Sequence, residues 1–262
     1  MNSFISVMLI VLFNSYDQSN IDYILAKYII EHIREFSDMS LKQFSEEVHV
    51  SVSSINHFLK RFSFQSFAGV KAYINRGLDF RYNQIKERYT YYDINIALNN
   101  IEFLSRQSID KTKMILQIEN VVDLLHEKKR IVILGAVYPA ALSLHFLEDM
   151  VLFGKCCRFI WKNTYEYDNT LNIEEDELLL IISYTGRLIT MKNGINNQIK
   201  NTKGKSILIS NDYIYENTVD SFLKIPVERG QDPEYQNAIV TELLSIIKFR
   251  YYEKYFLKEN NE

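Results

Sequence analysis

Residues 51–62 carry apolar and polar side chains with the period of an α-helix that has two unlike sides. At 100° per residue, Phe58, Leu59 and Phe62 all fall within about 60° of Ile55, so they form one packing face. The pattern predicts an amphipathic helix whose opposite side is free to hydrogen-bond. That polar side consists of Ser53, His57, Lys60 and Arg61.

A shorter helix is predicted immediately upstream of this one. Ser40 and Gln43 have the spacing of a capping box, and apolar residues recur at helical spacing between residues 41 and 48. Ser51 is suited to cap the second helix by accepting a backbone N–H. A short helix, a tight turn and a second helix make a helix-turn-helix, in which the second helix enters the major groove of DNA.

The polar side of residues 51–62 supplies the candidate DNA contacts. The N-terminal residues of such a helix meet base edges, whereas basic residues farther along meet phosphates. The alternative is an ordinary helical hairpin whose polar side is merely solvated. The candidates are Ser53, Ser54 and His57 for bases, Asn56 at the flank, Lys60 and Arg61 for phosphates, and Ser51 at a helix start whose free amides suit a phosphate oxygen.

The flanking residues complete an all-α N-terminal domain over residues 1–78. The apolar run 4–13 is too short to span a bilayer and lacks the basic region of a signal peptide, so we predict a buried first helix. A second helix is predicted from residue 21 to the residue before Ser37, and the apolar positions between 64 and 74 close the core. Residues 81–100 show no core periodicity, and we assign 79–107 as a linker.

The second half of the chain, residues 108–262, alternates helices and strands. A helix is predicted over 109–126, and strands over 130–134, 157–161, 178–182, 206–209 and 222–225. Further helices are predicted over 140–153, from about 187 to 200, and from about 234 to 256. This alternation requires parallel strands with right-handed crossovers, so the predicted fold is a three-layer α/β domain.

Charge is distributed unevenly along the chain. The net charge is −3, but residues 51–90 hold seven basic residues against Asp79 and Glu87. Such asymmetry is typical of a nucleic-acid-binding lobe joined to an acidic partner domain. The two cysteines are adjacent, which gives neither a disulfide nor a metal-ligand spacing, and no nucleotide-binding motif is present. We therefore expect a cytoplasmic protein without a cofactor or metal and without membrane contact.

Three loops are expected to converge beyond the carboxyl ends of the strands, where open parallel sheets bind ligands. They are residues 135–139, 183–187 and 210–212. Hydroxyls, a glycine and a following helix favour a phosphate there. The alternative is that these residues are the caps and turns of any α/β domain. The candidate ligand contacts are Gly135, Tyr138, Ser183, Thr185, Gly186, Arg187 and Ser210.

Residues 58–71 read Phe-Leu-Lys-Arg-Phe-Ser-Phe-Gln-Ser-Phe-Ala-Gly-Val-Lys, and this segment resembles the end of the N-terminal domain of RpiR-family regulators. That family follows its recognition helix with Arg-Phe and a Gly-Phe-x-Gly-Phe-x-x-Phe-Lys segment. Ser63 and Ser66 stand here in place of both glycines. The matching positions are Arg61, Phe62, Phe64, Phe67 and Lys71, and the resemblance adds Lys71 to the DNA-binding candidates.

The order of parts also resembles that family, because its helix-turn-helix precedes a sugar isomerase (SIS) domain that binds phosphosugars through a Ser-x-Ser-Gly-x-Thr loop. Ser183, Thr185 and Gly186 match that loop conservatively, but Leu188 replaces its final threonine. The first loop departs further, since the family's Gly-x-Gly-x-Ser is Gly-Ala-Val-Tyr-Pro over residues 135–139. The resemblance covers nearly the whole chain.

The resemblance implies a bacterial transcriptional regulator of carbohydrate metabolism genes and not an enzyme. Its expected partners are a double-stranded DNA operator, a sugar phosphate effector, and copies of itself in a homodimer or higher homo-oligomer. Two alternatives stay open. One is an SIS-type phosphosugar isomerase, for which Glu228 or Asp232 lies where a catalytic base is expected; the other is a ligand-free regulator with a degenerate sugar site.

Overall fold

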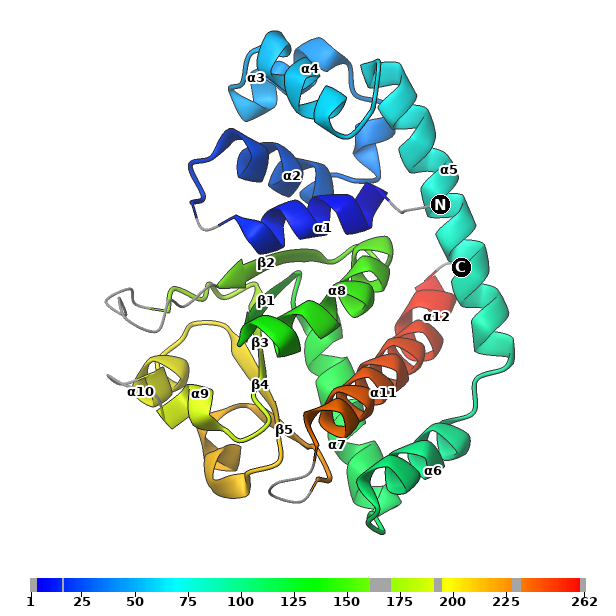
Figure 1. The fold of residues 1–262 in the computed structure, drawn as a ribbon, viewed down its shortest axis with the longest axis vertical. Helices are drawn as coiled ribbons and strands as arrows, with labels where there is room; N and C mark the ends of the chain where they lie inside the picture. The colour runs from blue at the N-terminus through cyan, green and yellow to red at the C-terminus, as the bar shows by residue number, and fades with distance from the viewer. Residues whose placement is uncertain (1–3, 16, 161–170, 191–194, 228–231, 260–262) are drawn as a thin grey trace.

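The computed structural model of the chain describes residues 4–15, 17–160, 171–190, 195–227 and 232–259. A helical part built from the N-terminal residues lies above an α/β part, and one long helix runs along the side of both (Figure 1). Within these described ranges, no helix combines the length and the apolar character needed to cross a bilayer.

The N-terminal helices enclose an aromatic core. Phe36, Phe44 and Phe67 are buried, and their ring centroids lie 5.1–5.8 Å apart. The second helix is shorter than predicted, because it ends at Glu31 and Phe36 belongs to a separate 3-10 turn that still points into the core. The helices are α1 (Phe4–Asn14), α2 (Ile21–Glu31), η1 (Glu35–Ser37), α3 (Leu41–Val48) and α4 (Val52–Arg61).

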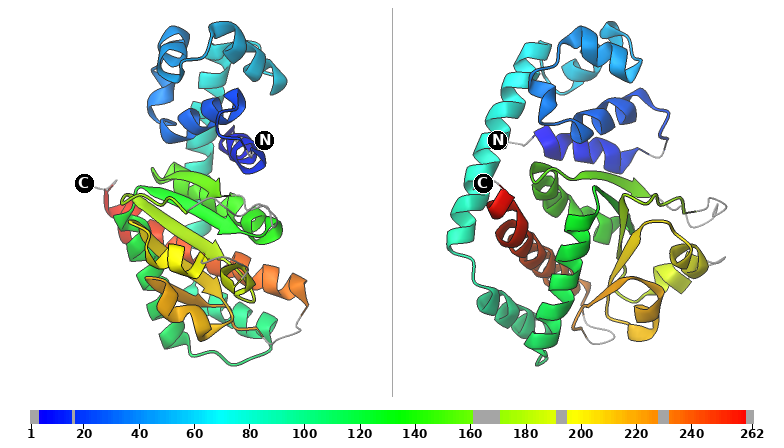
Figure 2. Two further views of the ribbon diagram at one scale, coloured as in Figure 1. Left: turned by 90° about the vertical axis from the view of Figure 1, so that its left-hand side faces the viewer. Right: turned by 180° about the vertical axis from the view of Figure 1, so that it is seen from behind.

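Helix α5 (Phe67–Thr90) is 24 residues long and runs from the helical part down to the α/β part (Figures 1 and 2). Residues 81–100, which the sequence pattern assigns to a linker, do contribute to the core, because Ile85 is fully buried and Leu98 lies in the core from α6 (Ile94–Ser105). Since α5 packs on different neighbours along its length, no single apolar stripe repeats along it. The predicted boundaries at residues 78 and 107 fall inside α5 and just after α6.

Five parallel strands form one sheet in the order β2-β1-β3-β4-β5, as the alternation of elements predicts. The second strand begins one residue earlier than predicted, and Trp161 lies outside the described residues. The strands are β1 (Arg130–Gly135), β2 (Cys156–Ile160), β3 (Glu177–Ile182), β4 (Lys205–Ser210) and β5 (Ser221–Lys224).

Helices cover both faces of the sheet, which gives the three layers expected of an α/β domain. Alternate residues of β1 face opposite ways: Ile131 and Ile133 belong to the large core, whereas Val132 and Leu134 belong to a second core on the other face. The large core is covered by α7 (Lys111–Glu127), α8 (Val137–Leu152) and α11 (Pro233–Tyr251), the second by α9 (Arg187–Thr190) and α10 (Ile195–Lys200). The chain ends with a π-helical turn (Tyr252–Phe256) and α12 (Leu257–Glu259).

The helical part also contacts the sheet directly. The rings of Phe13 at the end of α1 and Phe159 in β2 lie 5.3 Å apart, edge to face. Buried residues of α1 and α2 belong to the same apolar cluster as β1, α8 and α11. The two parts therefore share one continuous core.

Replacing Gly77 with alanine is expected to stabilise the protein by about 0.5–1 kcal/mol. The reason is that glycine has more conformational freedom than alanine in the unfolded chain, and this freedom is lost when the residue enters a helix. Gly77 lies within α5, and an added Cβ would meet no atom within 4 Å. Urea unfolding of the wild type and the variant measures the difference. A loss of stability would show that α5 is not helical at this position.

Candidate functional site

The start of α4 has the geometry predicted for a capped recognition helix. The hydroxyl of Ser51 accepts the backbone N–H of Ser54 at 3.1 Å, and Ser40 and Gln43 form the complete capping box of α3. The turn between the two helices is three residues long, and His49 adopts a left-handed conformation there with φ of 54°. Two capped helices joined by a short turn therefore lie where the sequence pattern predicts them.

The two sides of α4 differ in exposure as the sequence pattern predicts. Ile55 and Phe58 are fully buried and Leu59 is 1% exposed, so one side of the helix is committed to the core. On the other side, Ser53, His57 and Lys60 are exposed, and Asn56 at the flank is half-buried. The exposed face thus carries a hydroxyl, an imidazole and an ammonium in successive turns.

Four of the predicted DNA contacts, Ser51 among them, have partners within the protein. Arg61 forms an ion pair with Asp22 of α2, and this bond raises the pKa of the guanidinium. Lys71 donates to the carbonyl of Met39 at 3.1 Å. The Ser54 hydroxyl lies 2.9 Å from that of Ser51 at the cap. The other four predicted contacts, Ser53, Asn56, His57 and Lys60, form no side-chain hydrogen bond or ion pair with any of the described residues.

One exposed residue of α4, Val52, is not among the DNA contacts predicted from the sequence. Val52 is 41% exposed at the first position of the helix, beside Ser53. A valine methyl in the major groove suits the C5 methyl of thymine. Its position immediately after the cap residue Ser51 was the signal that could have identified it.

The first predicted loop, residues 135–139, presents exposed groups beyond the end of β1. Gly135 closes β1 and is half-buried, whereas Tyr138 is 79% exposed in the first turn of α8. Ala136 precedes α8 without a side-chain cap, so no side chain from that position satisfies the first amides of this 16-residue helix. The loop therefore offers backbone N–H groups and one large aromatic side chain.

In the second predicted loop, residues 183–187, the serine hydroxyl forms a hydrogen bond within the protein. The Ser183 hydroxyl is buried and accepts the N–H of Leu188 at 3.4 Å, while Thr185 is exposed. Gly186 has φ of 66°, a left-handed conformation that favours glycine, which explains its place in this turn. Arg187 begins α9, and its side chain lies outside the described part of the structure.

The single helix predicted over 187–200 is described as two short ones. Helix α9 has only four residues and α10 only six, and residues 191–194 between them lie outside the described ranges. A four-residue helix adds little aligned dipole at its N-terminus. The expected attraction of an anion to this helix is correspondingly small.

Ser210 ties the second and third loops together. It is fully buried at the end of β4, where its hydroxyl lies 3.5 Å from the Tyr184 carbonyl and accepts the N–H of Asp212 at 3.3 Å. The Tyr184 hydroxyl donates to Asn237 of α11, and burial raises the pKa of Tyr184 to about 12. Ser210 is thus placed to hold the loops rather than to face a ligand.

The described residues contain no cluster of three or more histidines, cysteines or carboxylates arranged to hold a metal ion. His145 and Glu148, which are three residues apart, both contact Arg81. Asp232, one of the two positions considered for a catalytic base, caps α11 by accepting the N–H of Glu234 at 2.9 Å. Glu228, the other, lies outside the described residues.

Comparisons with known proteins give similarities of low identity. No protein-family model matches the sequence, and no curated protein matches it. The NanR protein of Vibrio vulnificus, complexed with ManNAc-6P, is 10% identical over 98% of this chain and 94% of its own, with a TM-score of 0.46.

Two further solved structures are similar to part of this chain. A hypothetical protein of Methanococcus jannaschii, for which a function of 3-hexulose-6-phosphate isomerase was inferred, is 18% identical over 62% of this chain and 89% of its own, with a TM-score of 0.45. The sugar isomerase domain of an RpiR transcription factor from Sphaerobacter thermophilus is 15% identical over 64% and 95%, with a TM-score of 0.42. These values leave the function of this chain to be inferred from its own residues.

Proposed function

We propose that this protein is a DNA-binding transcriptional regulator whose α/β part binds a sugar phosphate and joins two copies of the chain. The observation that carries the proposal is the division of α4 into a buried side and an exposed polar side. Ile55 and Phe58 are 0% exposed, while Ser53, His57 and Lys60 face outward from a helix that follows a three-residue turn. A helix in this setting presents its first turns to the major groove.

Contacts at both ends of α4 hold this helix in place. Ser51 and Ser54 fix the start of α4, and the ion pair of Arg61 with Asp22 fixes its end against α2. A rigidly held helix loses little conformational entropy when it docks onto DNA. The same ion pair means that Lys60, not Arg61, is the phosphate contact we assign to the last turn.

The sugar phosphate is assigned to the strand-end loops. Thr185 and Tyr138 are exposed there, and the first turn of α8 provides amides without a side-chain cap. Phosphate oxygens accept hydrogen bonds from such amides and hydroxyls. Because Ser183 and Ser210 already bond within the protein, we assign them to the support of the loops.

Fluorescence anisotropy tests the proposal on the purified full chain, with DNA from upstream of its own operon and random DNA at the same salt concentration. Tight binding to the upstream DNA that a phosphosugar changes supports both parts of the proposal. Specific binding that no phosphosugar changes would contradict sugar phosphate sensing and favour a ligand-free regulator. Turnover of a hexose or pentose phosphate, without specific DNA binding, would establish the isomerase instead.

Two variants separate base contacts from phosphate contacts. We expect His57→Ala to lower the preference for operator over random DNA by roughly 1–3 kcal/mol, because a base contact is lost. Lys60→Ala should weaken both DNAs similarly and reduce the salt slope by about 0.9, because one phosphate contact is lost. Lys203→Ala removes the same charge from the α/β part, beside Glu174, and should leave the slope unchanged. An equal effect of Lys60→Ala and Lys203→Ala would contradict the assigned face.

A further inference from the structure

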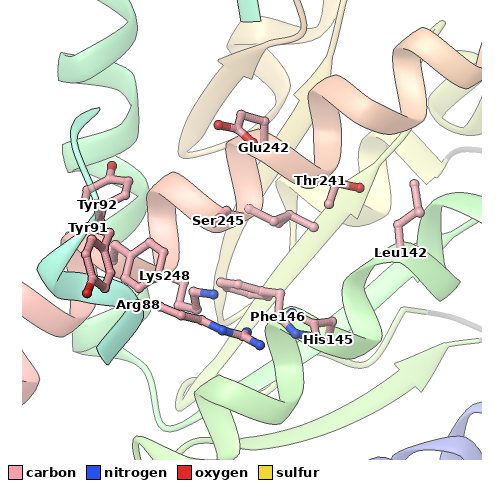
Figure 3. Close-up of a pocket in the computed structure, with 12 residues that line it drawn as sticks. Arg88, Tyr91, Tyr92, Leu142, His145, Phe146, Thr241, Glu242, Ser245 and Lys248 are labelled. Carbon is pink, nitrogen blue, oxygen red and sulfur yellow. The ribbon is translucent and has the colours of Figure 1, made fainter. Parts of the chain in front are cut away.

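A pocket of about 420 Å³ lies where the C-terminal end of α5 meets α8 and α11 (Figure 3). Arg88 comes from α5, His145 from α8 and Lys248 from α11. In Figure 3 the nitrogen-bearing ends of these three side chains point toward one another, although they are far apart in the sequence. The pocket is separate from the strand-end loops discussed above, because none of its lining residues comes from those loops.

Two of the three cations around this pocket are paired with carboxylates. Arg81 lies 2.7 Å from one oxygen of Asp149 and 3.6 Å from Glu148, and Lys248 lies 3.3 Å from the other oxygen of Asp149. Two carboxylates thus face two cations. Arg88 is a third cation, and it forms no ion pair with any residue in the described ranges. The guanidinium of Arg88 is exposed and is therefore available to a ligand.

Burial makes the charge of Lys248 costly, whereas Arg88 is exposed. Lys248 is 4% exposed, and its pKa is lowered chiefly by burial, with the charges of Arg81 and Arg88 acting in the same direction against the opposing effect of Asp149. An anion beside Lys248 and Arg88 would offset the repulsion between them. Charge-assisted hydrogen bonds to such an anion are stronger than neutral ones.

His145 supplies a neutral donor to the same space. Its Nε2 lies 2.9 Å from a guanidinium nitrogen of Arg81, and since arginine has only donors, Nε2 accepts and the ring proton is on Nδ1. Burial lowers the pKa of His145, which agrees with a neutral ring. The remaining carboxylate of the pocket, Glu242, lies on its far side in Figure 3 and accepts from Asn100 at 3.4 Å.

Four aromatic side chains form part of the wall, together with Leu142, Leu244, Thr241 and Ser245. Tyr91 is 83% exposed and Tyr92 half-buried at the end of α5, while Phe146 and Phe249 are buried on α8 and α11. We propose that this pocket binds a phosphate monoester, with the phosphate held by Arg88, Lys248 and His145 and a ring-sized organic body against the aromatic wall. A bound ester would bridge α5 to α8 and α11.

Phenyl phosphate is the probe, because it combines the two groups that the pocket accommodates. Isothermal titration calorimetry on the full chain should detect binding, and phenol, which lacks the phosphate, should not bind. Arg88→Gln should weaken the affinity roughly tenfold or more, since a charged hydrogen bond is lost. Lys86→Gln removes the same charge two residues away on α5, outside the pocket, and should leave the affinity unchanged.

Other outcomes would overturn the proposal. These are no binding at millimolar phenyl phosphate, equal weakening by Arg88→Gln and Lys86→Gln, or weakening by Ser183→Ala but not by Arg88→Gln. The last result would place the ester at the strand-end loops and so would support the proposed sugar phosphate site. The measurement involves no DNA, so a failure of DNA binding and a failure of this pocket are distinguishable.

Discussion

Replacing Asp149 with alanine is expected to lower the free energy of unfolding by about 3–5 kcal/mol, because two buried cations lose their shared partner. Asp149 is fully buried on α8. One of its oxygens accepts from Nε of Arg81 at 2.7 Å, and the other lies 3.3 Å from Nζ of Lys248. The carboxylate thus joins α5, α8 and α11, and without it Arg81 and Lys248 repel each other inside the protein.

The test is urea unfolding followed by circular dichroism at constant pH. Asp176→Ala is the matched control, because Asp176 pairs with Arg130 at 3.3 Å but its side chain is 47% exposed. Exposed pairs contribute only about 0–1 kcal/mol, so this control should change stability little. A loss of less than 1 kcal/mol for Asp149→Ala would show that the carboxylate is solvated and that α5 is held by its apolar contacts alone.

The sequence was most informative where the hydrophobic pattern is local. The buried and exposed sides of α4 follow directly from the 3.6-residue period around Ile55, and the capping box at Ser40 lies three residues from its partner Gln43. Strands β1 and β3 were recognisable because both of their faces are buried, which produces uninterrupted apolar runs. Such signals depend on neighbours within a few residues.

The role of α5 could not be read in the same way, because its contacts are remote and aromatic. Tyr89 and Tyr92 look polar in the sequence, yet their rings lie 5.1 Å from that of Tyr252 and 4.6 Å from that of Phe249 respectively. Arg81 contributes a charge to a local count, but its partner Asp149 is 68 residues away. A segment with these contacts resembles a linker until the tertiary structure is known.

The strand-end loops show a similar limit. Chain order places Ser183, Thr185 and Ser210 at the same edge of the sheet, and the parallel strand order confirms that edge. The sequence does not say which hydroxyls bond within the protein. The buried hydroxyl of Ser210 forms hydrogen bonds with the adjacent loops, whereas Thr185 is exposed.

Replacing Gly204 with alanine is expected to destabilise the protein by roughly 3 kcal/mol, the upper range for forcing extra volume into a packed site. Gly204 is buried immediately before β4. An added Cβ would clash with the carbonyl oxygen of Glu177, and it would lie 2.5 Å from that of Glu174 and 2.7 Å from a methyl of Ile173. Two of these three obstacles are backbone atoms, which cannot rotate away as a side chain does.

The backbone at Glu177 is itself held in place. The buried carboxylate of Glu177 accepts two hydrogen bonds from Arg158, at 2.8 and 2.6 Å, so β3 cannot move without disturbing β2. Urea unfolding of Gly204→Ala measures the cost, with Gly77→Ala as the matched control because the same methyl group enters open space there. Opposite signs for the two variants would establish that the methyl's surroundings decide the effect; a neutral Gly204→Ala would mean that the connection before β4 is looser than this packing requires.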